Sequence, residues 1–92
     1  MTIIEGEAQP RLSRGVRLRE DAARGCTVLL APERVLNPSP TAVAVLQRCD
    51  GERSVEAIID ELASAYAADR TQIAADVRAL LGDLAMKGLV QL

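Results

Sequence analysis

The side chains of this chain that could take part in chemistry are two thiols and a scatter of carboxylates. Cys26 and Cys49 lie far apart in the sequence, and the chain contains no histidine. A nucleophilic thiol needs a base or another charged group beside it, and histidine is the usual proton carrier near neutral pH. With no histidine and no Cys-x-x-Cys spacing, neither a catalytic cysteine nor a metal site is predicted. Both cysteines are expected to be small buried hydrophobic residues.

Three carboxylates stand where they could act as acids or bases, but each has a simpler structural explanation. Glu33 follows a proline at an expected turn, Asp50 precedes a glycine at an expected helix end, and Asp76 lies on the flank of an expected helix. No glycine-rich phosphate loop is present. We therefore expect a protein that is not an enzyme and that holds no cofactor and no metal.

The bulk composition predicts one small domain that does not bind nucleic acid. The chain has 92 residues, of which 49% are hydrophobic and 1% aromatic, and its formal net charge is −2. A general nucleic-acid binder normally carries a basic excess. No basic leader and no apolar run of membrane-spanning length is visible, so a cytoplasmic protein with no membrane partner is expected. Arginines crowd the first quarter of the chain, at positions 11, 14, 17, 19 and 24.

The elements that would position these residues begin with a small sheet. Residues 1–10 are expected to form a flexible tail or linker, and residues 11–92 a single domain. Apolar and charged residues alternate over 16–20, which is typical of a strand with one apolar face, and 26–31 is expected to be the central strand. Pro32 cannot donate to a sheet interior, so 34–36 is expected to be a short strand at the sheet edge.

Three helices follow. Ser39 is a plausible cap of a first helix that runs to about Cys49, and Asp50-Gly51 is expected to stop it. Ser54 would cap a second helix, and a third would start at Asp69 or Thr71 and close at Gly88. The expected inward faces are apolar stripes: Val55, Ile58, Ile59, Leu62 and Tyr66 on the second helix, and Ile73, Val77, Leu80, Leu81 and Leu84 on the third. The predicted fold is α+β, a small three-stranded N-terminal antiparallel sheet followed by a three-helix unit, similar to a winged helix-turn-helix.

This architecture leaves two functions open. The alternative is a winged helix-turn-helix DNA-binding regulator, but the charges on the expected third helix cancel, whereas a groove reader must neutralise phosphates. The favoured function is peptide binding, in which an extended peptide adds to the free edge at 34–36 and its side chains enter a gap beside the first half of the third helix. The predicted peptide-binding residues are Glu33, Arg34, Val35, Leu36, Ile73, Val77, Arg78 and Leu81.

Several segments, taken in order, resemble one known family. They are Gly15-Val16-Arg17-Leu18, Leu29 to Val35 with Pro32-Glu33-Arg34 at its centre, Cys49-Asp50-Gly51, and Asp76-Val77 followed by Leu80 and Leu84. Together they resemble the PqqD family of pyrroloquinoline quinone biosynthesis, whose domains are also called RiPP recognition elements. The proline-rich Asn37-Pro38-Ser39-Pro40 departs from the family pattern and leaves the entry to the first helix uncertain.

The resemblance implies a non-catalytic peptide chaperone. Such a protein would bind the ribosomal precursor peptide PqqA and present it to the radical-SAM enzyme PqqE, which joins a glutamate and a tyrosine of the precursor. The iron–sulfur chemistry would then belong to PqqE. Some relatives are fused behind PqqC, which would fit a linker over residues 1–10.

Overall fold

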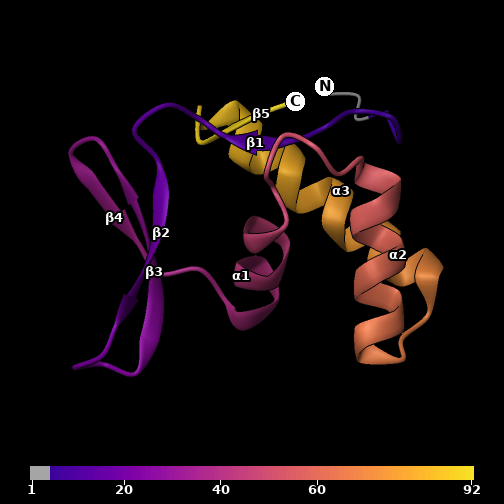
Figure 1. Cartoon of the computed structure of the whole chain (residues 1–92), viewed down its shortest axis with the longest axis horizontal. Helices are drawn as coiled ribbons and strands as arrows, with labels where there is room; N and C mark the ends of the chain where they lie inside the picture. Colours follow the sequence, from indigo (N-terminus) through magenta and orange to yellow (C-terminus); the bar gives the residue numbers. More distant parts are fainter. Residues whose placement is uncertain (1–4) are drawn as a thin grey trace.

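The computed structural model describes residues 5–92 and contains two small sheets and three helices (Figure 1). The strands are β1 (Arg11–Leu12), β2 (Arg17–Asp21), β3 (Cys26–Ala31), β4 (Arg34–Leu36) and β5 (Val90–Gln91). The helices are α1 (Pro40–Gln47), α2 (Val55–Tyr66) and α3 (Arg70–Met86). The α+β class and the predicted order of three strands before three helices are confirmed. The likeness to a winged helix-turn-helix is only loose.

The three-stranded sheet is antiparallel, with β3 in the centre and β4 at one edge. Ala31 pairs with Arg34, so the β3–β4 connection has two residues. Pro32 suits the first of them because its φ is fixed, and Glu33 takes the second with a left-handed φ of 62°. The proline therefore ends β3 and forces a tight return, which is why β4 is short and lies at the edge, as predicted.

Each helix begins at a capping side chain. Ser39 accepts a hydrogen bond from the amide of Ala42, Ser54 from that of Ala57, and Asp69 from that of Thr71. These bonds satisfy amides that have no partner inside the helix. The proline-rich entry to α1 is thus a regular helix start, with Ser39 as cap and Pro40 in the first turn.

The helix ends differ from the predictions in one place. Helix α1 ends at Gln47 and not near Cys49, because the amides of Arg48 and Cys49 turn back to the carbonyls of Val45 and Leu46. Asp50-Gly51 therefore begins the connection to α2 and is not the helix stop. Gly88 does close α3, with a left-handed φ of 73°.

Strand β1 and strand β5 pair with each other and join the two ends of the described chain. In Figure 1 they lie side by side above the helices. Val90 is buried in this pairing, and Leu92 beyond it is exposed. The β1–β5 pair is thus a second, two-stranded antiparallel sheet.

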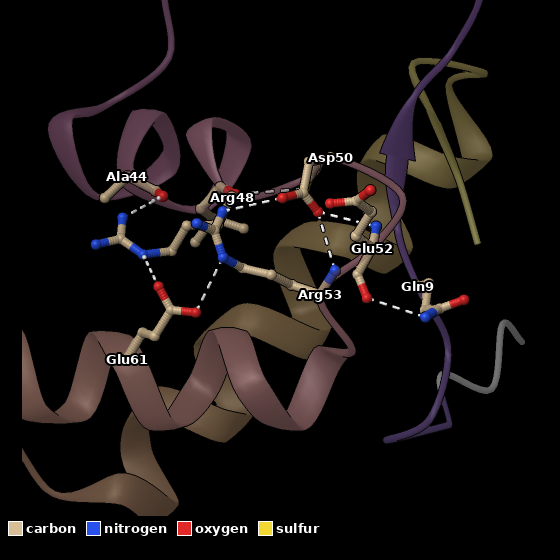
Figure 2. A network of polar contacts seen from close by, with 9 residues as sticks. Gln9, Ala44, Arg48, Asp50, Glu52, Arg53 and Glu61 are labelled. Carbon is tan, nitrogen blue, oxygen red and sulfur yellow. Dashed lines mark hydrogen bonds and ion pairs between the residues drawn. The ribbon is translucent and has the colours of Figure 1, made fainter.

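Residues 5–10, part of the predicted tail or linker, run along the start of α2. The amide of Val55 donates to the carbonyl of Ala8 at 2.8 Å, and the amide of Glu56 donates to the carbonyl of Gly6 at 3.0 Å. Gln9 donates to the carbonyl of Glu52 at 2.9 Å (Figure 2), and Pro10 is fully buried. Residues 1–4 of the predicted tail lie outside the described residues.

The core lies mainly among the three helices. Its fully buried residues include Val55, Ile58 and Ile59 on α2 and Leu81 on α3, with Leu29 contributed by the sheet. Two expectations about buried residues are wrong. Tyr66 falls on the apolar stripe of α2 but is 53% exposed, because it lies in the last position of the helix. Cys26 is exposed at the start of β3.

A polar network holds α1 against α2 (Figure 2). Glu61 pairs through one oxygen with Nε of Arg48 at 3.3 Å and through the other with Nε of Arg53 at 3.1 Å. Arg53 also pairs with Asp50 at 3.2 Å. Asp50 accepts the amides of Glu52 and Arg53, both at 2.9 Å, and so shapes the turn between the helices. The network therefore ties the α1–α2 connection to α2.

Among residues 5–92, no helix is both long and apolar enough to cross a bilayer.

Candidate functional site

The feature that stands out on this fold is the free edge of β4. The strand pairs with β3 on one side only. In a two-residue hairpin the closing pair, here Ala31 and Arg34, exchanges hydrogen bonds, and the next pair along an antiparallel ladder does not. The next pair is Leu30 and Val35, so the N–H and C=O of Val35 are expected to point outward. Val35 is 62% exposed, and its backbone can therefore accept a further strand.

An apolar hollow lies beside this edge, between β4, the start of α1 and the second half of α3. Its volume is about 280 Å³. We call it the strand hollow; the lining residues that matter here are Leu36, Pro38, Ala42, Leu80, Leu84 and Lys87. Arg34 donates from a guanidinium nitrogen to the carbonyl of Lys87 at 3.2 Å, which ties β4 to the end of α3. The strand hollow thus sits directly under the open edge.

A second apolar hollow continues the first toward the far end of the molecule. It has a volume of about 320 Å³ and is lined by α1, the end of α2 and the first half of α3. We call it the helix hollow, and its walls include Val45, Leu62, Tyr66, Ile73, Val77 and Leu80. Ser39, Ala42 and Leu80 line both hollows. Together the hollows form one groove that runs along α3, from β4 to Tyr66.

The four predicted residues on and before β4 lie at the open end of this groove. Leu36 lines the strand hollow and Arg34 bridges to α3. Val35 faces away from the hollow, since side chains alternate along a strand. Glu33 is exposed at the turn, and no side-chain hydrogen bond or ion pair of Glu33 is found within residues 5–92.

The four predicted residues on α3 are not all available to a ligand. Ile73 is half-buried and Val77 is 2% exposed, and both line the helix hollow, which includes no β4 residue. Leu81 is completely buried in the core and lines neither hollow. Arg78 pairs with Glu56 on α2 at 3.0 Å. The half of α3 next to β4 is thus the second half, and not the first half expected from the sequence.

Two residues of the predicted stripe on the third helix, Leu80 and Leu84, lie at the part of the groove next to β4. Leu80 is half-buried and lies at the junction, and Leu84 extends the wall toward β4. Ile73, Val77, Leu80 and Leu84 are spaced as i, i+4, i+7 and i+11, so one stripe of α3 lines the whole groove. That spacing was visible in the sequence. The contribution of Ser39 and Ala42 from α1 carried no such signal.

The titratable groups whose pKa values are shifted in the described chain are held by burial or by neighbouring residues. No group of three or more cysteine, aspartate or glutamate residues within residues 5–92 is placed to hold a metal ion. Burial, aided by the charge of Asp50, raises the pKa of Cys49 to about 11, which keeps its thiol protonated and unreactive near neutral pH. Hydrogen bonds from Arg70 and Arg78 hold the pKa of Glu56 below its usual range, and they bind α2 to α3. The groove itself offers apolar surface and backbone groups, which is the chemistry of peptide binding.

The comparison with known families agrees with this geometry. The family model described as "Coenzyme PQQ synthesis protein D (PqqD)" matches residues 26–90, from the central strand to β5. The chain belongs to the PqqD family. A relative from Rhodopseudomonas palustris (strain BisB5), named "PqqA binding protein", is 55% identical over 90 residues, which cover 98% of this chain and 87% of that protein. The protein of the same name from Xanthomonas axonopodis pv. citri (strain 306) is 47% identical over 92 residues and covers both chains completely.

Two solved structures share the PqqD arrangement of sheet and helices. One is the solution NMR structure of the PqqD truncation of Methylobacterium extorquens PqqCD, described as a functional and stand-alone RiPP recognition element. It is 44% identical, covers 99% of this chain and 97% of that one, and superposes with a TM-score of 0.84. The other is lasso peptide synthetase B1 complexed with its leader peptide, 25% identical, with a TM-score of 0.77 over 92% of this chain and 100% of that one.

Proposed function

We propose that this protein is a non-catalytic peptide chaperone, which binds the precursor peptide PqqA and presents it to the radical-SAM enzyme PqqE. The observation that carries the proposal is the open edge of β4 directly above an apolar groove. Relatives named for PqqA binding, and a structural neighbour complexed with a leader peptide, support it. In this proposal the iron–sulfur chemistry belongs to PqqE, and this chain contributes only binding.

The precursor leader would add as a strand along β4. Val35 offers one N–H and one C=O outward, and each hydrogen bond contributes a net of about 0.5–1.5 kcal/mol. Two such bonds fall well short of the roughly 8 kcal/mol that corresponds to micromolar affinity. Apolar side chains in the groove must therefore supply most of the binding energy, at about 1.5–3 kcal/mol for each fully buried aliphatic side chain. The affinity is thus set by Leu36, Leu80 and Leu84 more than by the strand edge.

Arg34 is the cation best placed for a leader carboxylate. It is exposed, and its guanidinium now bonds to a carbonyl at the end of α3. Arg78, the other cation predicted for this role, is held by Glu56. An exposed pair with Arg34 would add only about 0.2–1 kcal/mol. We therefore expect the charge to fix the register of the peptide more than its affinity.

The competing function, a DNA-binding regulator, finds no support in the charges of α3. Arg70 pairs with Glu56 and Asp60, Arg78 pairs with Glu56, and Lys87 beyond the helix pairs with Asp83. Every cation on or next to this helix thus already has an acidic partner. A helix that binds the major groove needs free cations to neutralise phosphates.

The test is titration of the protein with PqqA while backbone amides are followed by NMR and affinity is measured by calorimetry. Val35→Pro removes the outward amide, and Leu80→Asp places a charge at the junction of the two hollows. Both variants should weaken PqqA binding by about tenfold or more, which is 1.4 kcal/mol. Ala79→Asp is the matched control, because Ala79 is exposed one position away on α3 and should bind normally.

Amide shifts should cluster at residues 33–37 and along the groove stripe of α3. Equal binding by Val35→Pro, Leu80→Asp and the control would place the peptide elsewhere. Circular dichroism of each variant separates lost binding from lost folding. The mass of PqqA should stay unchanged after incubation with this protein alone, and a covalent change without PqqE would overturn the non-catalytic role.

A further inference from the structure

The helix hollow has a charged side chain in its lining, Asp76. This residue comes three positions after Ile73 and four before Leu80, so it shares the stripe of α3 that faces the groove. Among the described residues that line this hollow, all the others are uncharged. Neither strand addition at β4 nor apolar contact uses this carboxylate, so its place in the groove needs an explanation of its own.

The Asp76 carboxylate is free to take a cation. Its Oδ1 accepts a hydrogen bond from Nε2 of Gln72 at 3.0 Å, and no ion pair of Asp76 is found within residues 5–92. Lys87, the charged residue of the strand hollow, is neutralised by Asp83 at 2.9 Å. Carboxylates without an ion pair elsewhere, such as Glu52, line neither hollow. In the described chain, Asp76 is therefore the uncompensated charge of the groove lining.

An exposed aromatic ring belongs to the same hollow. Tyr66 is the one aromatic residue of the chain, and it is 53% exposed at the end of α2 although it lines the hollow. The face of an aromatic ring attracts a cation, and its apolar surface can cover a methylene chain. Most of the remaining lining is aliphatic, including Val45, Leu62 and Val77. The hollow thus combines an aliphatic floor, an aromatic ring and a free carboxylate.

The side chain of lysine or arginine matches this combination. Its methylene stem can be buried against aliphatic surface while its charged end reaches water or a carboxylate. A purely apolar side chain in the hollow would take water away from Asp76 and supply no hydrogen bond in return, which costs free energy. An acidic side chain would be repelled. The carboxylate therefore selects among the side chains that could fill the hollow.

We infer that the helix hollow binds a lysine or arginine side chain of the precursor, with the stem against the aliphatic floor and Tyr66 and the cation at Asp76. The inference rests on the proposed function and names the class of side chain that one end of the groove selects. Arg34 stands at the other end, on β4, where it suits an acidic side chain. The two ends of the groove carry opposite charges, so they favour one direction of the bound peptide over the reverse.

The test measures the affinity of Asp76→Asn for PqqA by calorimetry, with Glu52→Gln as the matched control. Both changes remove one negative charge, but only Asp76 lines the groove. Asparagine keeps an oxygen that can accept the bond from Gln72, so the fold should stay intact. Asp76→Asn should raise the Kd for PqqA about threefold to fivefold, and Asp76→Lys about tenfold or more, because attraction becomes repulsion. Glu52→Gln should bind as the unchanged protein does.

The partner of Asp76 is found with PqqA peptides in which each lysine or arginine is replaced in turn by norleucine, which keeps a methylene stem and removes the charge. With one of these peptides, Asp76→Asn and the unchanged protein should bind equally well. If the difference between the two proteins persists with every norleucine peptide, the inference is wrong. If it disappears only when the N-terminus of PqqA is acetylated, the cation is the terminal amine, which also overturns the inference.

Failure of the inference and failure of the proposed function give different results. Equal affinity of Asp76→Asn and the unchanged protein for PqqA, together with weak binding by Leu80→Asp, would mean that the hollow takes an uncharged side chain while the proposed function stands. Equal weakening by Asp76→Asn and Glu52→Gln would indicate a general effect of charge and would overturn the inference. Absence of PqqA binding by the unchanged protein would overturn both.

Discussion

The two thiols occupy opposite environments. Cys49 is buried at the end of α1, and its thiol donates to the carbonyl of Val45 at 3.3 Å. Cys26 is exposed at the tip of the β2–β3 hairpin. We expect a thiol-labelling reagent at pH 8 to modify Cys26 rapidly and Cys49 only after unfolding. Mass spectrometry over time checks this, and two labels at equal rates in the folded protein would contradict it.

The same contrast predicts different costs of removing each thiol. Cys49→Ala should lower the free energy of unfolding by about 1–2 kcal/mol through lost packing, whereas Cys26→Ala should change it by less than about 0.5 kcal/mol. The raised pKa of Cys49 means that its thiolate is disfavoured in the folded state. Its contribution to stability is therefore complete below the ordinary thiol pKa and declines as pH rises through about 11. Urea denaturation at several pH values measures both effects.

Asp50 shapes the turn between α1 and α2 through its charge. The amides of Arg53 and Glu52 hold the pKa of this carboxyl below its usual range. A lowered pKa contributes stability above the ordinary value of the group, and that contribution is lost as pH falls through the folded-state value. We expect Asp50→Ala to reduce stability at pH 7 more than Asp50→Asn does, since the Asn side chain can still accept an amide.

The difference between Asp50→Ala and the unchanged protein should shrink in acid, which chemical denaturation at pH 7 and pH 3 can measure. A difference that is independent of pH would show that the Asp50 charge does not matter. Ala23→Ser, on the exposed β2–β3 loop far from this turn, serves as a control and should behave as the unchanged protein at both pH values.

At the scale of the elements, the end of α2 is strained. Ala67 caps the helix with φ 49° and ψ 40°, a left-handed conformation that glycine adopts without cost. Ala67→Gly should therefore stabilise the protein by about 0.5–1 kcal/mol, after the greater flexibility of unfolded glycine is counted. Ala65→Gly, inside the same helix and also exposed, should destabilise it by about 0.5–1 kcal/mol. Urea denaturation of both variants gives the comparison, and the same sign for both would contradict the assignment.

The elements also explain why the groove stays open. Helix α1 has eight residues and ends before Arg48, and the network around Glu61 fixes its position against α2. Small residues of α1 that face α3, such as Ala42, leave room between the helices. The space between α1 and α3 thus follows from a small side chain on α1 and from the contacts that hold the end of α1 near α2.

For the molecule as a whole, the sheet and the helices differ in how firmly they are held. The helices share most of the buried core, whereas the sheet joins it through few side chains, chiefly Leu29, with Leu18 and Leu36 partly buried. Local opening needs less free energy where fewer apolar contacts are broken. We expect amide hydrogens of β4 to exchange much faster than those in the centres of α2 and α3.

Bound PqqA should slow exchange most strongly in β4, since the added strand would pair its free edge. Hydrogen exchange followed by NMR, with and without the peptide, measures both effects. Amides in the centre of α2 serve as the internal control and should change little. Protection that rises equally across the molecule would indicate general stabilisation and not strand addition at β4.

Local signals in the sequence were enough for most of the fold. Proline at 32 predicted the short edge strand, serines at 39 and 54 predicted two helix starts, and the apolar spacing on α2 and α3 predicted their buried faces. Such features act through the backbone and side chains of neighbouring residues, so they can be read without knowing the rest of the molecule. The resemblance to the PqqD family was equally visible.

The candidate site depended on contacts between distant residues. The sequence determined that β4 has a free edge and that α3 carries an apolar stripe, because proline chemistry and helical periodicity are local. Only the tertiary structure decided that the second half of α3 faces β4, that Leu81 and Val77 are taken by the core, and that Glu56 engages Arg78. The angle at which a helix crosses a sheet depends on the packing of all the neighbouring elements together. No single segment of the sequence therefore predicts this angle.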